Sequence, residues 1–268
     1  MGFSLDGVNW DSILSAVAEN TKNQILYRMP DISEGTVEVT ADTKDSTDKD
    51  GALIKRSYTA KSVSVTLTNT HLVLGAYGGT TGSGKIVLSE DESETAPRML
   101  LIDPVTEYIL PDEPHTGTLS VTPVYSNGGT GTGYTLAADS TATDTTFAYA
   151  TSSRKLTLPT NIASDVSQIL IKYEYTCTDG VIVENHADKF PKTVKLTLQG
   201  LYFDPCEKDV LRLGYIVFPS FQPSPETSFS MQNDSTFDYK GDAQSDYCAK
   251  KKRLYYMVFP ANDIQEDE

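Results

Sequence analysis

A strict alternation of apolar and polar side chains limits the fold of this chain more than any other feature. The alternation runs through residues 62–68 and 193–199, and in the first of these Val63, Val65 and Leu67 fall on one side. A repeat of two residues places such side chains on one face of a β-strand, because successive side chains point to opposite faces of a sheet. The pattern predicts antiparallel sheets that bury one face and expose the other.

Two apolar segments lack this alternation. Residues 215–218 and 254–259 are apolar or aromatic at every position, which is typical of strands buried on both faces. Each segment runs into the same three residues, Val-Phe-Pro, at 217–219 and 258–260. Proline has no N–H to donate to a strand ladder, so we expect both strands to stop there.

Residues 9–20 carry a helical signal. Trp10, Ile13, Leu14 and Val17 follow the spacing i, i+3, i+4, i+7, which places them on one face of an α-helix. This spacing predicts a short N-terminal helix that docks against the sheets.

The middle of the chain differs in composition from its flanks. Residues 115–180 contain only five acidic and three basic residues and are rich in Thr, Ser, Ala and Gly. Short strand patterns separated by turn signals predict a small β-sandwich there, inserted into a larger β domain built from 1–114 and 181–268. The predicted fold class is all-β: a sandwich or barrel with one short N-terminal helix and an inserted small sandwich. The strands expected within the insert are 119–124, 145–150, 155–158 and 168–175.

The chain is acidic, with 37 acidic and 22 basic residues and a net charge of −15. This charge excludes proteins that grip DNA or RNA, whose affinity comes from Lys and Arg on phosphates, and proteins that bind anionic membrane surfaces. No apolar run reaches the roughly 18 residues that cross a bilayer, and the N-terminus lacks the basic and apolar segments of a secretory signal. We expect a protein that is made and kept in a cytoplasm, with no membrane partner.

The sequence contains no arrangement typical of a metal centre or a disulfide framework. Cys177, Cys206 and Cys248 have no C-x-x-C spacing and no neighbouring histidine, and three cysteines are too few for such a framework. A structural zinc site needs clustered ligands. We predict free thiols, no metal and no cofactor; whether these cysteines meet across subunits stays open.

Two motifs match known ligand sites only in part. Residues 79–85, Gly-Thr-Thr-Gly-Ser-Gly-Lys, match the first seven positions of a phosphate-binding P-loop, but Ile86 replaces the Ser or Thr that reaches Mg²⁺. The residues that follow predict a strand, whereas phosphate binding needs a helix N-terminus, so we interpret 79–85 as a flexible glycine loop between strands. Residues 48–51 echo a calcium loop but lack its outer carboxylates, and Asp50-Gly51 predicts a hairpin turn instead.

Nothing in the sequence predicts catalysis. A hydrolytic triad needs a histidine that is oriented by a carboxylate and faces a nucleophile, and His71, His115 and His186 stand in separate contexts. The G-x-S-x-G elbow and the H-E-x-x-H zinc motif are both absent, and the carboxylates of 90–94 predict a solvated loop. We predict a protein that is not an enzyme and has no catalytic residues.

Three stretches resemble parts of tailed-bacteriophage structural proteins. Residues 50–61, Asp-Gly-Ala-Leu-Ile-Lys-Arg-Ser-Tyr-Thr-Ala-Lys, with the strand that follows them, resemble the N-terminal half of this group, and so do residues 188–200. Residues 229–243 are similar to the closing hairpin of tail tube proteins. The resemblance covers most of 30–75 and 181–260.

The resemblance implies a mechanical function. Tail tube proteins form a β-sandwich or barrel whose sheets join between subunits into closed rings, usually hexameric, and the rings stack into a tube. Joining satisfies edge strands that would otherwise aggregate. A long hairpin or loop and a terminal segment reach the next ring, and residues 31–61 are the candidate for this hairpin. Residues 115–180 are similar in character to the Ig-like decorations that such proteins carry.

The resemblance also implies partners and a location. The partners are other copies of the chain, other tail proteins such as sheath, terminator and baseplate or tip components, and genomic DNA, which passes through the lumen without specific binding. The protein would lie in the virion tail, after assembly in the host cytoplasm. A lumen lined by carboxylates repels phosphate, and residues 1–114 carry a net −9 and residues 181–268 a net −4 of the total −15.

Two alternatives stay open from the sequence. One is another virion component, such as a capsid decoration or a tail-associated protein. The other is an Ig-like module that binds a carbohydrate or a host surface, and it is motivated by the threonine-rich 115–180 region.

Overall fold

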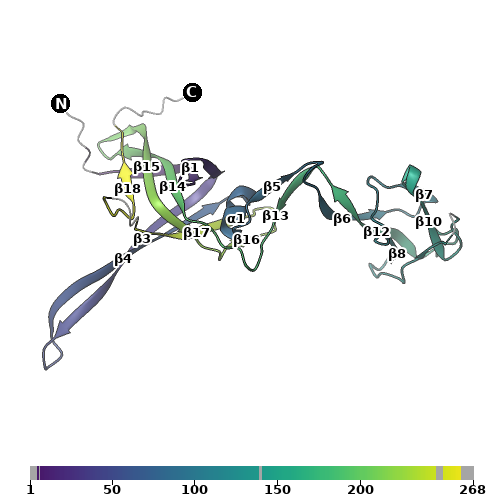
Figure 1. The fold of residues 1–268 in the computed structure, drawn as a ribbon, viewed down its shortest axis with the longest axis horizontal. Helices are drawn as coiled ribbons and strands as arrows, with labels where there is room; N and C mark the ends of the chain where they lie inside the picture. Colours follow the sequence, from purple (N-terminus) through teal and green to yellow (C-terminus); the bar gives the residue numbers. More distant parts are fainter. Residues whose placement is uncertain (1–4, 6, 139–140, 246–249, 261–268) are drawn as a thin grey trace. The chain divides into compact units, whose positions relative to one another are not determined.

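The protein is almost entirely β-structure, which confirms the all-β prediction (Figure 1). Two compact units divide the chain: unit 1 contains the chain up to Ile86 and from Val183 onward, and unit 2 contains Val87–Ile182. Each unit has its own hydrophobic core. The computed structural model of the protein describes residues 5, 7–138, 141–245 and 250–260.

Unit 1 is built on a nine-stranded antiparallel sheet. Its strands are β1 (Asn9–Glu19), β2 (Ile25–Met29), β3 (Ile32–Thr47), β4 (Leu53–Asn69), β14 (Val194–Asp204), β15 (Glu207–Pro223), β16 (Ser228–Phe229), β17 (Phe237–Ala243) and β18 (Tyr256–Val258). They follow the order β2-β1-β14-β15-β17-β4-β3, with β16 paired to β17 and β18 paired to β15. The edge strands of this path are β2 and β3.

The core of unit 1 follows the predicted alternation. In β4, Val63, Val65 and Leu67 are almost completely buried, and the apolar residues of β14 join the same cluster. Across the core, the hydroxyls of Tyr27 on β2 and Tyr239 on β17 lie 2.8 Å apart in a buried hydrogen bond. The strands predicted from alternation at 62–68 and 193–199 are therefore confirmed.

Residues 9–19 form strand β1, so the prediction of an N-terminal helix over 9–20 is wrong. β1 pairs with β14, and its register shifts between Trp10 and Ser12 and again between Ile13 and Ser15. Each shift is a bulge that adds one residue to the strand. Trp10 and Ile13 of the helical pattern pair with Tyr202 and Gly200, so they fall on one face of the sheet although they lie three residues apart, which is also a helical spacing. Leu14 is the residue added by the second bulge, and Val17 pairs with Thr197 on the opposite face.

The prediction for the two purely apolar segments is confirmed for one and wrong for the other. In β15, the neighbouring residues Val217 and Phe218 are both buried, as a strand covered on both faces requires. In β18, Met257 and Val258 are 44% and 41% exposed. The strand β15 also continues past Pro219, because Pro219 lies in an irregularity of the pairing with β14, where no N–H is required.

The helix of the described structure is α1 (Leu74–Thr81), and it takes in the first part of the segment that we predicted to be a flexible loop. α1 ends at Gly82, whose φ of 76° lies in the left-handed region that glycine adopts without strain. Gly79 has no side chain, which lets the helix pack directly on the ring of Tyr27. The strand predicted after this segment is present as β5 (Lys85–Leu88).

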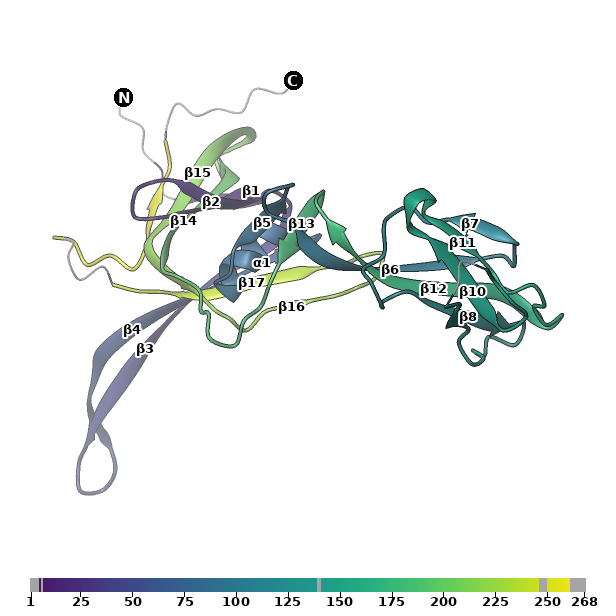
Figure 2. The same ribbon diagram turned by 45° about the vertical axis from the view of Figure 1, so that its right-hand side comes forward.

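Unit 2 contains two sheets that share one core (Figure 2). Its elements are β6 (Glu94–Ile102), β7 (Glu107–Ile109), β8 (Ser120–Tyr125), β9 (Thr135–Leu136), β10 (Thr146–Ala150), the 3₁₀ turn η1 (Thr151–Ser153), β11 (Lys155–Thr157) and β12 (Val166–Cys177). One sheet has the order β7-β11-β10-β9 and the other β6-β12-β8. A separate two-stranded sheet joins β5 to β13 (Gly180–Val183).

The strands predicted at 119–124, 145–150, 155–158 and 168–175 correspond to β8, β10, β11 and β12. β6 and β7 precede residue 115 in the sequence, and they too belong to unit 2. The core brings Phe147 and Leu156 of one sheet together with Ile169 and Ile171 of the other. Unit 2 is thus a small two-sheet sandwich.

Candidate assembly surfaces and a cleft

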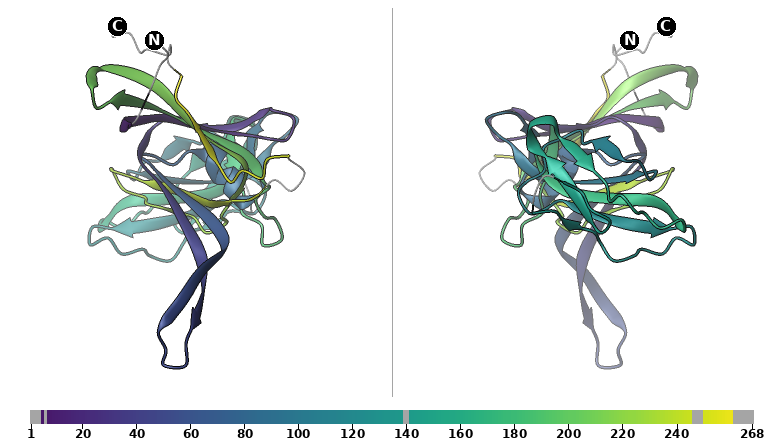
Figure 3. Two further views of the ribbon diagram at one scale, coloured as in Figure 1. Left: turned by 90° about the vertical axis from the view of Figure 1, so that its left-hand side faces the viewer. Right: turned by 90° about the vertical axis from the view of Figure 1, so that its right-hand side faces the viewer.

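The outer halves of β3 and β4 form a two-stranded ribbon, which we call the arm and define as residues 41–61 (Figure 3). β17 pairs with β4 only from Val63 to Asn69, so beyond that point β3 and β4 pair with each other alone. The turn at the tip is closed by Asp48, whose carboxylate accepts hydrogen bonds from the backbone of Asp50 and Ala52 at 2.9 and 2.8 Å. This confirms the hairpin turn predicted at 50–51, with Gly51 at a φ of 84°.

The arm has no buried side chain. Leu53, Ile54 and Tyr58 are 55%, 69% and 70% exposed, although such side chains are usually covered. Arg56 donates two hydrogen bonds of 2.8 Å to the carboxylate of Asp45 across the ribbon, and this lowers the pKa of Asp45. Cross-strand pairing of this kind orders the ribbon, but it leaves the apolar side chains in water.

Within the described part of the chain, β2 and β3 each pair on one side only, so both edges of the unit 1 sheet are open there. β2 carries Ile25 and Leu26, which are 66% and 50% exposed. β3 is the strand at the other edge, and its outer half is one of the two strands of the arm. An edge strand presents unpaired backbone N–H and C=O groups, which are a template for another strand. The open edges and the arm therefore lie on the same sheet.

The face of β3, β4 and β17 that points away from the core carries hydroxyls and carboxylates, and we call it the hydroxyl–carboxylate face. Its side chains form rows across the strands: Thr68 of β4 lies between Glu34 and Asp238, and Ser64 lies between Glu38 and Asp242. Thr68 donates a 3.0 Å hydrogen bond to Asp238. A third row is Thr36, Thr66 and Lys240.

The charge of this face is negative. It holds the carboxylates of Glu34, Glu38, Asp238 and Asp242, and its base is Lys240, which lies 3.5 Å from Asp238. Of the carboxylates, Glu34, Glu38 and Asp242 are exposed. The face is thus a sheet surface of small hydroxyl side chains with a surplus of carboxylates.

The division of charge between the two units differs from the division predicted for the segments of the sequence. Unit 2 has 13 acidic and 4 basic residues, a net −9, and unit 1 has 24 acidic and 18 basic residues, a net −6. The difference comes from residues 87–114, which are strongly acidic and belong to unit 2. The overall charge therefore says little about the unit 1 sheet, and the local charge of the hydroxyl–carboxylate face says more.

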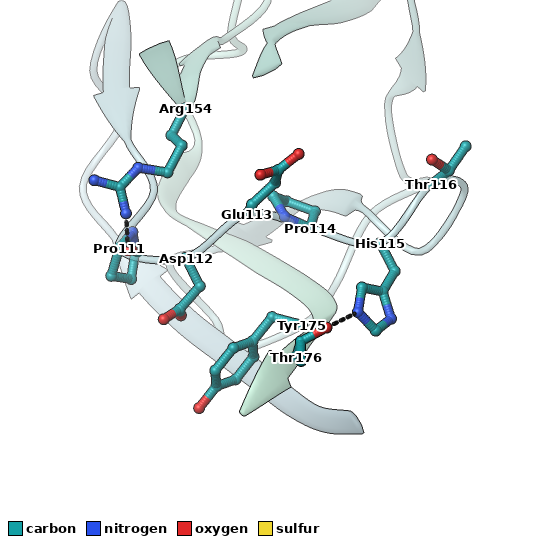
Figure 4. Close-up of a pocket in the computed structure, with 9 residues that line it drawn as sticks. All are labelled: Pro111, Asp112, Glu113, Pro114, His115, Thr116, Arg154, Tyr175 and Thr176. Atoms are coloured by element: carbon teal, nitrogen blue, oxygen red, sulfur yellow. Dashed lines mark hydrogen bonds between the residues drawn. The ribbon is translucent and has the colours of Figure 1, made fainter. Parts of the chain in front are cut away.

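Unit 2 contains a polar cleft of about 590 Å³ (Figure 4). Arg98 donates to the carboxylate of Asp112 at 2.9 Å, and the hydroxyl of Tyr173 donates to the same oxygen at 3.1 Å. The guanidinium of Arg154 donates to the carbonyl of Pro111. The residues that line the cleft are Pro111, Asp112, Glu113, Pro114, His115, Thr116, Arg154, Tyr175 and Thr176.

Each of the three histidines contacts a different polar residue. His71 lies 3.7 Å from Asp31, His115 lies 2.8 Å from the hydroxyl of Thr176, and His186 lies 2.8 Å from Glu184. The hydrogen bond from His186 lowers the pKa of the Glu184 carboxyl. Each histidine therefore has a local polar partner.

The remaining residues singled out in the sequence are not brought together. Cys177 and Cys206 are free, and Cys248 lies outside the described residues. Within the described part of the chain, no group of three or more His, Cys, Asp or Glu residues could hold a metal ion. No described helix is long and apolar enough to cross a membrane. Sequence reasoning missed the cleft, because its residues come from three separate stretches.

The fold defines the class of the protein: it is an all-β protein whose unit 1 sheet has two open edges and carries the two-stranded arm. The model of the YomU/Tube protein family matches residues 106–258, more than half of the 268-residue chain. The chain belongs to this family of phage-associated tube proteins. Membership in this family supports a structural role in the phage tail tube. A search of curated proteins found no match to the sequence.

Proposed function

We propose that this protein is the subunit of a phage tail tube whose copies assemble into stacked, closed rings, most simply hexamers. The arm is the observation that carries the proposal. A two-stranded ribbon without a hydrophobic face is barely stable in water, and this one exposes Leu53, Ile54 and Tyr58 as well. A neighbouring copy that covers the arm would remove this apolar surface from water.

The charge of the arm supports a second copy as its partner. Residues 41–61 contain five bases and four acids, whereas the whole chain has a net charge of −15. A slightly basic ribbon therefore meets an acidic surface on any other copy of the chain. Complementary charge of this kind speeds association and selects the partner.

The open edges support closure into rings. β2 of one copy and β3 of the next would pair as neighbouring strands and satisfy the backbone groups of both edges. Such a head-to-tail contact uses two different surfaces, and it gives a ring when the rotation between copies closes.

The arm has a direct test by electron microscopy of the purified protein. Ala41 and Lys61 are paired in register, so an Asn-Gly turn in place of residues 42–60 closes a shorter hairpin. We expect the natural chain to form rings and tubes at high concentration and the shortened chain to remain monomeric. The circular dichroism spectrum of the shortened chain should still be that of a folded β-protein. A natural chain that stays monomeric would contradict the proposal, and so would tubes formed by the shortened chain.

We further propose that the hydroxyl–carboxylate face lines the lumen through which DNA passes. Carboxylates repel phosphate. Hydroxyl side chains carry no positive charge, so they cannot displace the counterions of DNA, and DNA gains no binding free energy from counterion release at this face. The lysine variant Glu34→Lys/Glu38→Lys/Asp242→Lys would reverse the charge of this face.

Tubes of the lysine variant should retain duplex DNA added at low salt and release it as salt rises, whereas natural tubes should retain none. The matched control is Glu90→Lys/Asp91→Lys/Glu92→Lys in an exposed loop of unit 2, which makes the same change in net charge. Equal DNA retention by both variants, measured by co-sedimentation, would show that the face does not line a lumen.

A further inference from the structure

The cleft of unit 2 has no part in the assembly proposed above. Its volume of about 590 Å³ lies within the roughly 300–1,000 Å³ of small-molecule sites. Its walls are polar, and residues 111–116, 154 and 175–176 line it (Figure 4). We propose that this cleft binds a neutral saccharide.

The charges of the lining balance, and this points to a neutral ligand. The charge of Asp112 is neutralised within the protein by Arg98, whose guanidinium lies 2.8 Å from the carboxylate, and the Tyr173 hydroxyl donates a further hydrogen bond to it. Glu113 and Arg154 then contribute one negative and one positive charge. A ligand of either charge gains at one of these residues and loses at the other. A sugar hydroxyl donates and accepts, so neighbouring hydroxyls can pair with both residues in charge-assisted hydrogen bonds.

The position of Arg154 is held at a cost in backbone strain. Its φ of 51° lies in the left-handed region, which arginine seldom adopts. Its backbone carbonyl accepts a 2.9 Å hydrogen bond from Leu110, and its guanidinium donates to the carbonyl of Pro111. These contacts hold the cation at the wall of the cleft. A guanidinium has five N–H donors, so several are left for a ligand.

The aromatic wall suits the apolar side of a sugar. Tyr175 lines the cleft, and the guanidinium of Arg98 lies over its ring, 4.8 Å from the centroid. Tyr173 packs against the same ring edge to face. The ring is therefore held in place before a ligand arrives, and an aromatic surface is a favourable platform for the C–H groups of a pyranose. The hydrogen bond to Thr176 orients His115 beside it.

Saturation-transfer NMR on the full-length chain tests the proposal. The probes are lactose, maltose and N,N′-diacetylchitobiose, each at about 10 mM, which saturates a site of millimolar affinity. Galacturonic acid and glucosamine serve as charged comparators. We expect at least one neutral disaccharide to give a saturable signal that exceeds those of the charged sugars.

Two variants assign the signal to the cleft. Glu113→Gln keeps the shape of the side chain, and Arg154→Asn removes the guanidinium while supplying a residue that tolerates the left-handed region. Each should weaken binding about tenfold or more, since each removes a hydrogen bond to a charged group. Arg154→Asn should not lower the melting temperature. The control is Lys172→Gln, an exposed position on β12 outside the cleft, which should bind as the natural chain does.

The outcomes separate clearly. The proposal is overturned if none of the neutral disaccharides gives a signal. It is also overturned if a charged sugar gives the stronger signal. Binding that survives both cleft variants would place the sugar elsewhere on the molecule and would also overturn it. Ring assembly does not enter these measurements, so the cleft and the tube can fail independently.

Discussion

The buried hydroxyl pair of Tyr27 and Tyr239 makes the fold of unit 1 sensitive to alkali. Burial raises the pKa of Tyr27 from 10.0 to about 12 and that of Tyr239 well above 10.0. The folded state therefore keeps these protons at a pH where the unfolded chain has lost them. The stability they contribute is complete below pH 10 and is lost as the pH rises through about 12. We expect the free energy of unfolding in urea to fall over that window.

The double variant Tyr27→Phe/Tyr239→Phe should show a shallower fall than the natural chain. Tyr173 in unit 2 also has its pKa raised to about 12 by burial, so the comparison with the natural chain isolates the pair. At neutral pH, Tyr27→Phe alone should cost about 1–3 kcal/mol, because it leaves the Tyr239 hydroxyl buried without its partner, and the double variant should cost less. A double variant with the natural alkaline slope would exclude the pair as the cause.

At the scale of the element, the close packing of β1 on β14 and β15 depends on Gly200 of β14 and on Gly214 of β15, where a Cβ would lie 2.9 Å from the Trp10 ring. A Cβ on Gly200 would lie 2.7 Å from the carbonyl oxygen of Ser12 and 3.0 Å from the ring of Trp10. Gly200→Ala should therefore destabilise unit 1 by about 1–3 kcal/mol, because the backbone of the bulged strand must move. Trp10 is the single tryptophan of the chain, so its fluorescence reports both the unfolding and the displaced ring.

Gly7→Ala is the matched control for this prediction. A Cβ there would meet the side chain of Pro205 at an ordinary 3.9 Å, and we expect no change in the urea midpoint. A stable Gly200→Ala with unchanged Trp10 emission would mean that the bulged pairing is looser than the distances indicate.

The two units should unfold separately at the scale of the whole molecule. Each has its own core, and the cores contain no residue in common. A chain of this kind need not unfold in one step. We expect calorimetry of the full chain to show two transitions, and the isolated fragment 87–182 to unfold cooperatively near one of them. A single transition in the full chain, with an unfolded fragment, would contradict the independence of unit 2.

Local pattern was enough to predict much of the sheet and little of the site. The strands at 62–68 and 193–199 were predictable because alternation needs no knowledge of the partner strand. The hairpin turn at 50–51 was predictable for the same reason. The candidate surfaces were not, because the rows of the hydroxyl–carboxylate face join residues from β3, β4 and β17 that lie far apart in the sequence.

The sequence by itself determined an all-β protein with an acidic charge, since strand period and composition are properties of the chain alone. Only the tertiary structure decided that 9–19 is a strand, because its bulges exist only in the pairing with β14. The same holds for the strongly acidic residues 87–114, which contacts assign to unit 2. Which carboxylates share a face, and which side chains meet in a cleft, depends on long-range pairing that no local pattern encodes.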